Sequence, residues 1–156
     1  MKDRIYASDD KRWLFEKLVK TNENPDGIFE NYKDLLITAA VIGYKNDEPL
    51  KLEKKGPEIP LRVFENTPGN KDLIDIIALD KTEDVNILNW KDDEIVFKKF
   101  QIFEEFANGG LKILDQKLFQ NNTDIYENLL QLISVELDNE NKNENKLDLT
   151  SLIGSI

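Results

Sequence analysis

The stretch "FEEFANGGLKILDQKLF", residues 103–119, decides how the helices of this chain are divided. Its apolar residues recur every three or four positions, which is the spacing of a helix with one buried face. The interruption at Asn108, Gly109 and Gly110 is unfavourable inside a helix, because each glycine costs about 1 kcal/mol relative to alanine. Asn and Gly also accept the positive φ of a C-terminal cap. We therefore predict a structural corner at these three residues, with a second helix starting at Leu111.

The same spacing elsewhere predicts a mainly α fold. Gly43 and Asn70 are placed to cap the end of one helix and the start of the next. With a short strand at residues 3–8, we expect a single compact helical domain of about six helices with a short N-terminal strand. Helices are expected at residues 9–21, 28–45, 71–82, 91–108, from 111 onward, and from 122 or 123 to 137. In the last helix the residues predicted to be buried are Ile125, Leu129, Leu130, Ile133 and Leu137.

Residues 46–70 contain four prolines and two glycines, so they cannot form a long helix. We predict an irregular Pro-rich connector with short extended pieces around Leu50–Leu52 and Leu61–Phe64. A segment this long without regular structure is unusual in a compact domain. It is therefore either functional or contains a small sheet, and the sequence leaves both readings open.

The composition changes after residue 137. Residues 138–148, "DNENKNENKLD", are almost entirely polar and cannot bury enough surface to offset the entropy of ordering. We expect a helical domain at 1–137 and a mobile polar tail at 138–156 that ends in an apolar peptide. That peptide either docks on a protein partner or returns to its own domain. The predicted partner-binding residues are Leu147, Leu149, Leu152, Ile153 and Ile156.

The chain contains no His and no Cys among its 156 residues. This excludes the usual Ser-His and Cys-His nucleophile systems, disulfides and most zinc sites. No run approaches the roughly 20 apolar residues of a membrane span, and the N-terminus lacks the apolar core of a secretory signal. We therefore expect a cytoplasmic protein that does not contact a membrane and has no catalytic residues, no metal and no cofactor.

The net charge of −10 is distributed unevenly. Residues 1–60 carry 11 basic and 12 acidic side chains, whereas residues 61–156 carry 10 and 19. An acidic region repels the phosphates that drive nucleic-acid binding. Any direct DNA contact should therefore come from the N-terminal portion.

A strand at 3–8 followed by helices at 9–21 and 28–44 is the order of a ribbon-helix-helix DNA-binding element. Such a fold dimerises through its strand and reads the major groove with it. Lys2, Arg4 and Tyr6 would share one face of that ribbon. A DNA-binding adaptor is thus the second functional hypothesis, although the loop "NENPDG" between the helices is acidic where phosphate contacts are expected.

A metal-dependent nuclease is the third hypothesis. Glu53, Lys54 and Lys55 contain the Glu-x-Lys half of a signature in which acids bind Mg²⁺ and the lysine polarises the phosphate. No partner acid precedes it at a strand end, which favours a basic loop. Two acidic clusters could also bind a metal, but both are accounted for by the charges of a solvated helix. These clusters are Asp92, Asp93 and Glu94, and Glu104 with Glu105.

Three stretches resemble the dnd system-associated protein 4 family, whose members accompany DNA phosphorothioation systems. They are "FENYKDLLITAAVIGYK" at 29–45, "IPLRVFE" at 59–65 and "FQIFEEFANGGLKIL" at 100–114, and the likeness extends over about residues 3–135. It implies a bacterial accessory protein of systems that replace a non-bridging phosphate oxygen of DNA with sulfur, or restrict DNA lacking that mark. It implies no catalytic residues.

The leading hypothesis is a non-catalytic interaction subunit of a phosphorothioation-linked anti-phage complex. Its partners would be protein subunits of that complex, with at most weak or indirect DNA contact. The acidic body, the missing catalytic residue types and the apolar C-terminal peptide support it. The identity of the partner and the stoichiometry do not follow from the sequence.

Overall fold

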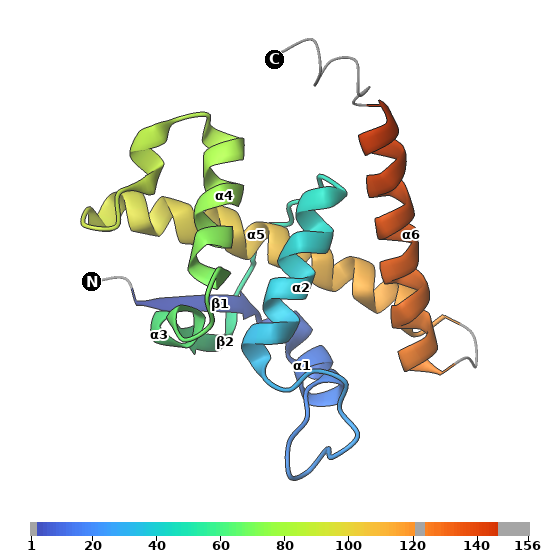
Figure 1. Ribbon diagram of the computed structural model, residues 1–156. Helices are drawn as coiled ribbons and strands as arrows, with labels where there is room; N and C mark the ends of the chain where they lie inside the picture. The colour runs from blue at the N-terminus through green and yellow to red at the C-terminus, as the bar shows by residue number, and fades with distance from the viewer. Residues whose placement is uncertain (1–2, 121–123, 147–156) are drawn as a thin grey trace. The chain divides into compact units, whose positions relative to one another are not determined.

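The computed structural model describes residues 3–120 and 124–146, with side chains through residue 138 (Figure 1). The chain divides into two compact units, residues 1–115 and 116–156. Six α-helices and one two-stranded sheet are present among the described residues, so the predicted mainly α class with a short N-terminal strand is confirmed. The long helix α5 (Asp93–Leu118) contributes to both units.

The first unit begins with an antiparallel pair of strands, β1 (Arg4–Ser8) and β2 (Lys55–Pro60). Ile5 lies opposite Ile59, and both are buried. The register shifts between Tyr6 and Ser8, which places a bulge where Gly56 approaches the start of the first helical turn. The small sheet that the sequence left open therefore exists, and its second strand lies inside the Pro-rich connector.

Prolines shape this connector in a different way from the one predicted. The predicted extended piece at Leu61–Phe64 is wrong, because α3 (Leu61–Glu65) is helical there. Pro60 has the extended conformation of an N-cap residue and starts that helix. The piece at Leu50–Leu52 has no regular structure, and the strand follows it instead.

Four further helical segments complete the N-terminal part of the first unit, in chain order. They are the 3-10 helix η1 (Asp9–Lys11), α1 (Arg12–Leu18), α2 (Tyr32–Lys45) and α4 (Asn70–Thr82), with the 3-10 helix η2 (Val85–Leu88) after α4. Asn31 caps α2 by accepting a hydrogen bond from the Asp34 amide at 2.9 Å. The predicted cap at Asn70 is wrong, since Gly69 is the N-cap with a φ of 89°.

The predicted corner at Asn108, Gly109 and Gly110 is wrong. Helix α5 runs through all three residues without a break, and none of them has a positive φ. The glycines are required by close contact instead. A Cβ on Gly110 would lie 1.6 Å from the Ala39 carbonyl oxygen of α2, and one on Gly109 would lie 1.5 Å from the Glu48 oxygen.

The contact between α2 and α5 explains Gly43 as well. Gly43 lies inside α2 and does not form the left-handed cap that the sequence predicted. A Cβ there would lie 2.0 Å from the Phe106 carbonyl oxygen of α5. Small residues on both helices thus allow their backbones to approach more closely than ordinary side chains permit. Figure 1 shows α4 and α2 crossing α5 at successive points along its length.

Asn108 holds the connector against α5. Its side-chain amide donates to the Leu50 carbonyl at 3.1 Å, and the Leu50 amide donates to the Glu105 carbonyl at 2.9 Å. Asn108 is buried, and its oxygen lies 3.5 Å from the Lys11 ammonium. The motif therefore joins three parts of the first unit: η1, the connector and α5.

The core of the first unit lies where α1, α2, α3 and α4 meet α5 and the sheet. Phe64 and Phe103 meet edge to face with their ring centroids 5.9 Å apart. The largest fully buried apolar residues are Ile5, Leu14, Phe15, Leu18, Leu35, Leu36, Phe64, Ile74, Ile77, Phe103 and Leu111. Within the described ranges, no helix is both long and apolar enough to cross a membrane.

Candidate interaction surface

Helix α6 (Ile125–Lys146) forms most of the described part of the second unit. Leu129 and Leu132 are buried, and they face the end of α5. The Asn128 side chain donates to the Leu118 carbonyl at 2.8 Å, which ties this face of α6 to the last turn of α5. One apolar side of the helix is therefore already covered.

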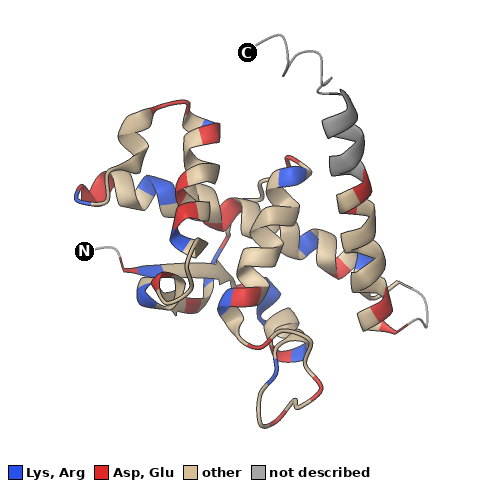
Figure 2. Cartoon of the chain, in the orientation of Figure 1, with Lys and Arg blue, Asp and Glu red and all other residues tan. Residues whose placement is uncertain are grey.

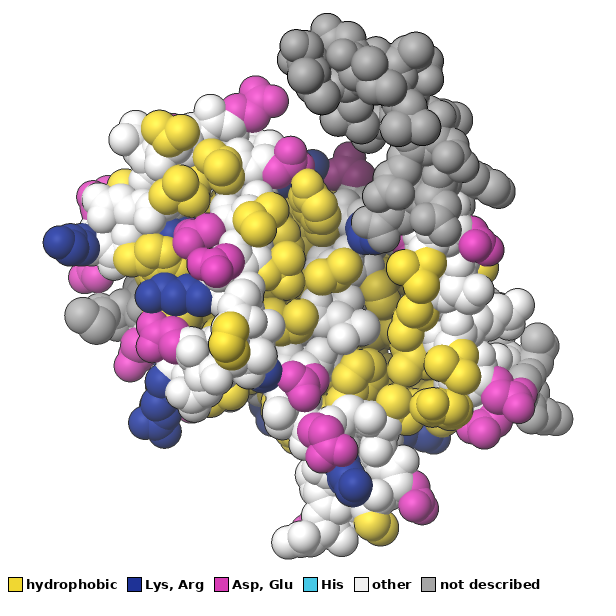
Figure 3. All heavy atoms as spheres, in the orientation of Figure 1, with side chains coloured by type: hydrophobic (Ala, Val, Ile, Leu, Met, Phe, Trp, Pro, Cys, Tyr) yellow, Lys and Arg dark blue, Asp and Glu magenta, His cyan; other side chains and the backbone are white. Residues whose placement is uncertain are grey.

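A second set of apolar residues on α6 is exposed. Tyr126, Leu130, Ile133 and Leu137 have exposed fractions of 54%, 50%, 39% and 53%. Their spacing of four, three and four residues places them on one face of a helix. We call these four residues the α6 stripe. Figure 3 shows hydrophobic side chains gathered along the described part of this helix.

Acidic residues flank the α6 stripe. At 100° per residue, Glu127 and Asp138 both project beside the stripe on the side away from Leu129. Residues 125–138 contain no Lys or Arg. Figure 2 shows acidic positions toward both ends of the coloured part of α6. The surface is thus apolar along its centre and negative along one rim.

The structure corrects the predicted burial on this helix. Leu129 is buried as predicted, but Leu130, Ile133 and Leu137 are exposed. Helix α6 also extends to Lys146, beyond the predicted end at residue 137. The two apolar sets could have been separated in the sequence, because Leu129 and Leu132 are offset by one position from Leu130 and Ile133.

A cleft of about 260 Å³ lies beside the covered face of α6. Its lining is mainly polar and differs from the α6 stripe in that respect: Lys117, Gln120, Asn128, Gln131, Leu132 and Val135. Amide groups dominate this lining, so it favours hydrogen-bonding groups over an apolar side chain. The cleft and the stripe are therefore separate features of the second unit.

The predicted partner-binding residues follow α6 directly in the sequence. Leu147, Leu149, Leu152, Ile153 and Ile156 lie outside the described residues. Their role stays a prediction, as does the domain boundary at residue 137. The described structure nevertheless places an exposed apolar surface on the helix that leads into them.

The predicted DNA-binding residues belong to β1, whose observed partner is β2 of the same chain. A ribbon-helix-helix protein instead pairs this strand with a second copy. Arg4 forms an ion pair with Glu58 at 2.8 Å, and Tyr6 lies beneath the Lys55 ammonium, 4.5 Å from its ring centroid. Lys2 lies outside the described residues.

Acidic side chains also accompany the other cations near this strand. Lys11 lies 3.0 Å from Asp10. Arg12 and Lys54 both face Asp9, at 3.1 and 3.5 Å, and hydrogen bonding from Arg12 holds the pKa of Asp9 below its usual range. Pairing of this kind weakens the positive field that a phosphate backbone requires.

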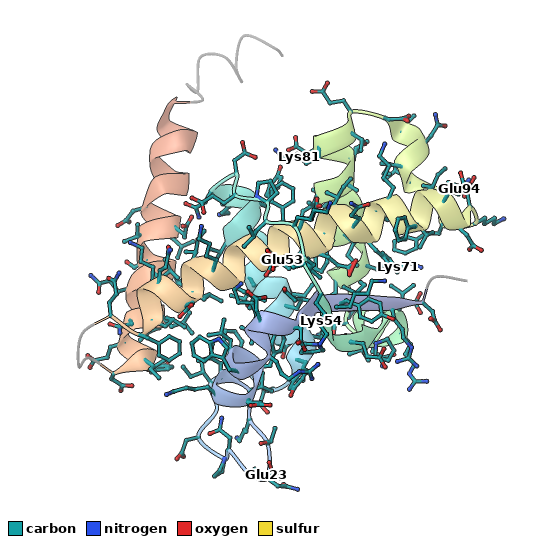
Figure 4. The ribbon with its side chains drawn as sticks, turned by 180° about the vertical axis from the view of Figure 1, so that it is seen from behind. Glu23, Glu53, Lys54, Lys71, Lys81 and Glu94 are labelled. Atoms are coloured by element: carbon teal, nitrogen blue, oxygen red, sulfur yellow. The ribbon has the colours of Figure 1, made fainter. Side chains whose placement is uncertain are left out.

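The residues considered for a nuclease are dispersed. Figure 4 shows Glu53 beside the middle of α5 and Glu94 at the start of that helix. Asp92 accepts a hydrogen bond from the Glu94 amide at 2.9 Å, and the Tyr6 amide donates to Glu104 at 2.9 Å. Across residues 3–120 and 124–146, no three His, Cys, Asp or Glu side chains are grouped so that they could hold a metal ion.

One buried ionic cluster was missed by the sequence analysis. Lys99 of α5 has an exposed fraction of 0%, and its ammonium lies 2.6 Å from Asp75 of α4. The other Asp75 oxygen accepts from the Trp90 indole at 2.9 Å, and Lys99 lies 3.7 Å from the Trp90 ring centroid. Burial lowers the pKa of Lys99, while Asp75 opposes that effect. The Lys98–Lys99 pair in an otherwise amphipathic pattern was the available signal.

A protein-family model described as DNA sulphur modification system-associated protein 4 matches residues 4–152. The matched range includes every helix and strand of the structure, from β1 to α6. No curated protein matches the chain, and no solved structure matches it.

Proposed function

Because the chain belongs to the DNA sulphur modification system-associated protein 4 family, we propose that it is a non-catalytic interaction subunit of such a system. In this role it binds other protein subunits of an anti-phage complex that modifies DNA or restricts unmodified DNA. The α6 stripe is the observation that carries the proposal. It offers four large apolar side chains, each about half exposed, on one face of one helix.

The physical argument is that exposed apolar side chains at helical spacing gain free energy when another protein covers them. Covering apolar surface yields about 25 cal/mol per Å². Aromatic and aliphatic residues grouped on one helix face are the usual anchors of helix-mediated recognition. The apolar residues at 147–156 extend the same element along the chain, which supports a binding role for both.

The interior of the first unit also supports a structural role over a catalytic one. Lys99 is the buried lysine with a lowered pKa, yet it is covered from solvent and held by Asp75. A nucleophilic or proton-transferring lysine has to reach a substrate. The cluster around Trp90 is better suited to joining α4, η2 and α5.

The test is an affinity pull-down with the tagged full chain from a host that expresses the neighbouring genes, with and without nuclease treatment. We compare the native chain with Leu130→Gln/Ile133→Gln and with Val85→Gln. Val85 is 71% exposed on η2 and provides a matched loss of surface apolarity away from α6. System proteins should be recovered after nuclease treatment with the native chain and with Val85→Gln, and be lost with the double variant.

Two other results would contradict the proposal. Recovery that disappears with nuclease treatment would indicate that DNA bridges the proteins and would favour the DNA-binding adaptor. Full recovery by Leu130→Gln/Ile133→Gln would exclude the α6 stripe. Deletion of residues 147–156 is a separate variant, which should weaken binding and leave the thermal unfolding temperature nearly unchanged.

A further inference from the structure

The α6 stripe has the dimensions of a contact with one helix. Tyr126 and Leu137 are eleven positions apart, which corresponds to about 16 Å at 1.5 Å per residue. Spacing of four, three and four residues is the pattern with which helices pack along a heptad seam. A partner helix of about three turns would cover all four side chains of the stripe.

The charge beside the stripe restricts what that helix can be. Residues 125–138 contain Glu127, Glu136 and Asp138 and no basic residue. Residues that flank an apolar seam lie close to the flanking residues of the partner helix, so their charges decide which partners are favourable. The charged rim of the stripe contains Glu127 and Asp138 and therefore requires positive charge opposite it.

Several occupants carry charge of the wrong sign. A second copy of this chain would bring the same acidic residues against Glu127 and Asp138. Residues 147–156 of the chain itself contain Asp148 and no Lys or Arg. Anionic lipid surfaces and nucleic acids would be repelled for the same reason. A protein helix with basic flanks has no such conflict.

We propose that the α6 stripe binds an amphipathic helix of a partner protein in which Lys or Arg residues flank the apolar seam. This inference rests on the interaction role proposed above and adds the chemical class of the partner. Apolar burial along the stripe supplies most of the affinity, and the acidic rim selects the sign of the partner's charge.

The experiment titrates the full chain against three fluorescent peptides of about 14 residues, which is two heptads. The first has Leu at seam positions and Lys in the flanks, and the second has the same Leu positions with Glu in the flanks. The third has the composition of the first in an order that is not amphipathic. Binding is measured by fluorescence anisotropy at physiological ionic strength.

The Lys-flanked peptide should bind at least about tenfold more tightly than either of the others, a difference of about 1.4 kcal/mol. Leu130→Gln/Ile133→Gln should weaken its binding by a similar factor, and Val85→Gln should not. Glu127→Lys/Asp138→Lys should reverse the preference toward the Glu-flanked peptide. Circular dichroism of each variant checks that the helical fold is retained.

The inference is overturned by equal affinity for the Lys-flanked and Glu-flanked peptides, or by equal affinity for the scrambled peptide, which would mean attraction by net charge alone. Self-association abolished by Leu130→Gln/Ile133→Gln would identify a second copy as the occupant. Tighter peptide binding after deletion of residues 147–156 would identify that segment instead.

The two proposals fail in different ways. Loss of the pull-down with Leu130→Gln/Ile133→Gln but no preference for the basic peptide would leave the interaction role intact and reject the charge rule. A pull-down unaffected by the double variant would reject the interaction role of the stripe, whatever the peptides do.

Discussion

Gly110 of α5 faces the Ala39 carbonyl of α2, so closely that a Cβ on Gly110 would lie 1.6 Å from the carbonyl oxygen. The obstructing atoms belong to backbone, which cannot rotate away as a side chain can. This contact fixes the distance between the two helices that form the centre of the first unit.

Gly110→Ala should therefore destabilise the protein although alanine is the better helix former. Alanine gains about 1 kcal/mol of helix propensity, but the displaced backbone of α2 costs more, for a net loss of about 1–3 kcal/mol. Chemical denaturation measures the change. Gln101→Ala, at an exposed position of the same helix, is the control and should change the free energy of unfolding by less than about 0.5 kcal/mol. A more stable Gly110→Ala would contradict the close contact.

Asn108→Ala should loosen the connector. The substitution removes the donor to the Leu50 carbonyl and leaves a buried acceptor unpaired, a loss of about 1–3 kcal/mol. Hydrogen exchange of the Leu50 amide, which donates to Glu105, should accelerate more than that of amides in α4. Uniform acceleration over the whole chain would instead indicate a global loss of stability.

Asp75→Asn should be among the most damaging single changes. It removes the counter-ion of an ammonium that is fully buried, and breaking a buried pair from one side costs about 3–5 kcal/mol. Asp75→Asn/Lys99→Met should be more stable than Asp75→Asn alone, because the uncompensated charge is gone. Thermal and chemical unfolding provide the comparison, with the exposed Asp72→Asn as control. A double variant no better than the single one would show that the ion pair is not the cause.

Tyr44 predicts a dependence of stability on alkaline pH. Its hydroxyl donates to Asp80 at 2.7 Å, and this hydrogen bond, with burial and the Asp80 charge, raises the pKa of Tyr44 to about 12. The unfolded chain loses this proton near pH 10, so the stabilisation is complete below pH 10 and is lost as the pH rises toward 12.

Tyr44→Phe should accordingly lower the free energy of unfolding by about 1 kcal/mol near neutral pH. The difference from the native chain should shrink between pH 10 and 12. Tyr126→Phe, on the exposed stripe, is the matched control. A difference that stayed constant across this range would separate the effect from the hydroxyl proton.

Two neighbouring leucines of α6 should respond in opposite ways to the same change. Leu129→Gln removes a buried side chain and should cost about 2–5 kcal/mol. Leu130→Gln, at a half-exposed position, should cost less than about 1 kcal/mol. Denaturation of both variants is the test, and an equal loss would place Leu130 in the core.

The sequence predicted helices from periodicity and strands from alternation, and these patterns are local. Residues 71–82 and the first strand are nearly as expected, because their apolar spacing and flanking residues act within a few positions of the chain. The family likeness was also visible in the sequence, and the family model confirms it.

Only the tertiary structure decided the role of the glycines. Propensity argued for a corner at Gly109 and Gly110, but the gain from packing α2 and the connector against α5 exceeds the roughly 1 kcal/mol that each glycine costs in a helix. The identity of the strand partner was equally inaccessible, because the β1–β2 pairing joins residues more than 40 positions apart.

The candidate surface shows the same division. The sequence of α6 determined that its apolar residues outnumber those one helix face can bury, but it did not determine which would be covered. Contact with the end of α5 covers Leu129 and Leu132 and leaves Leu130, Ile133 and Leu137 exposed. A periodic pattern specifies an apolar face, and only a neighbouring element in three dimensions decides how much of that face is buried.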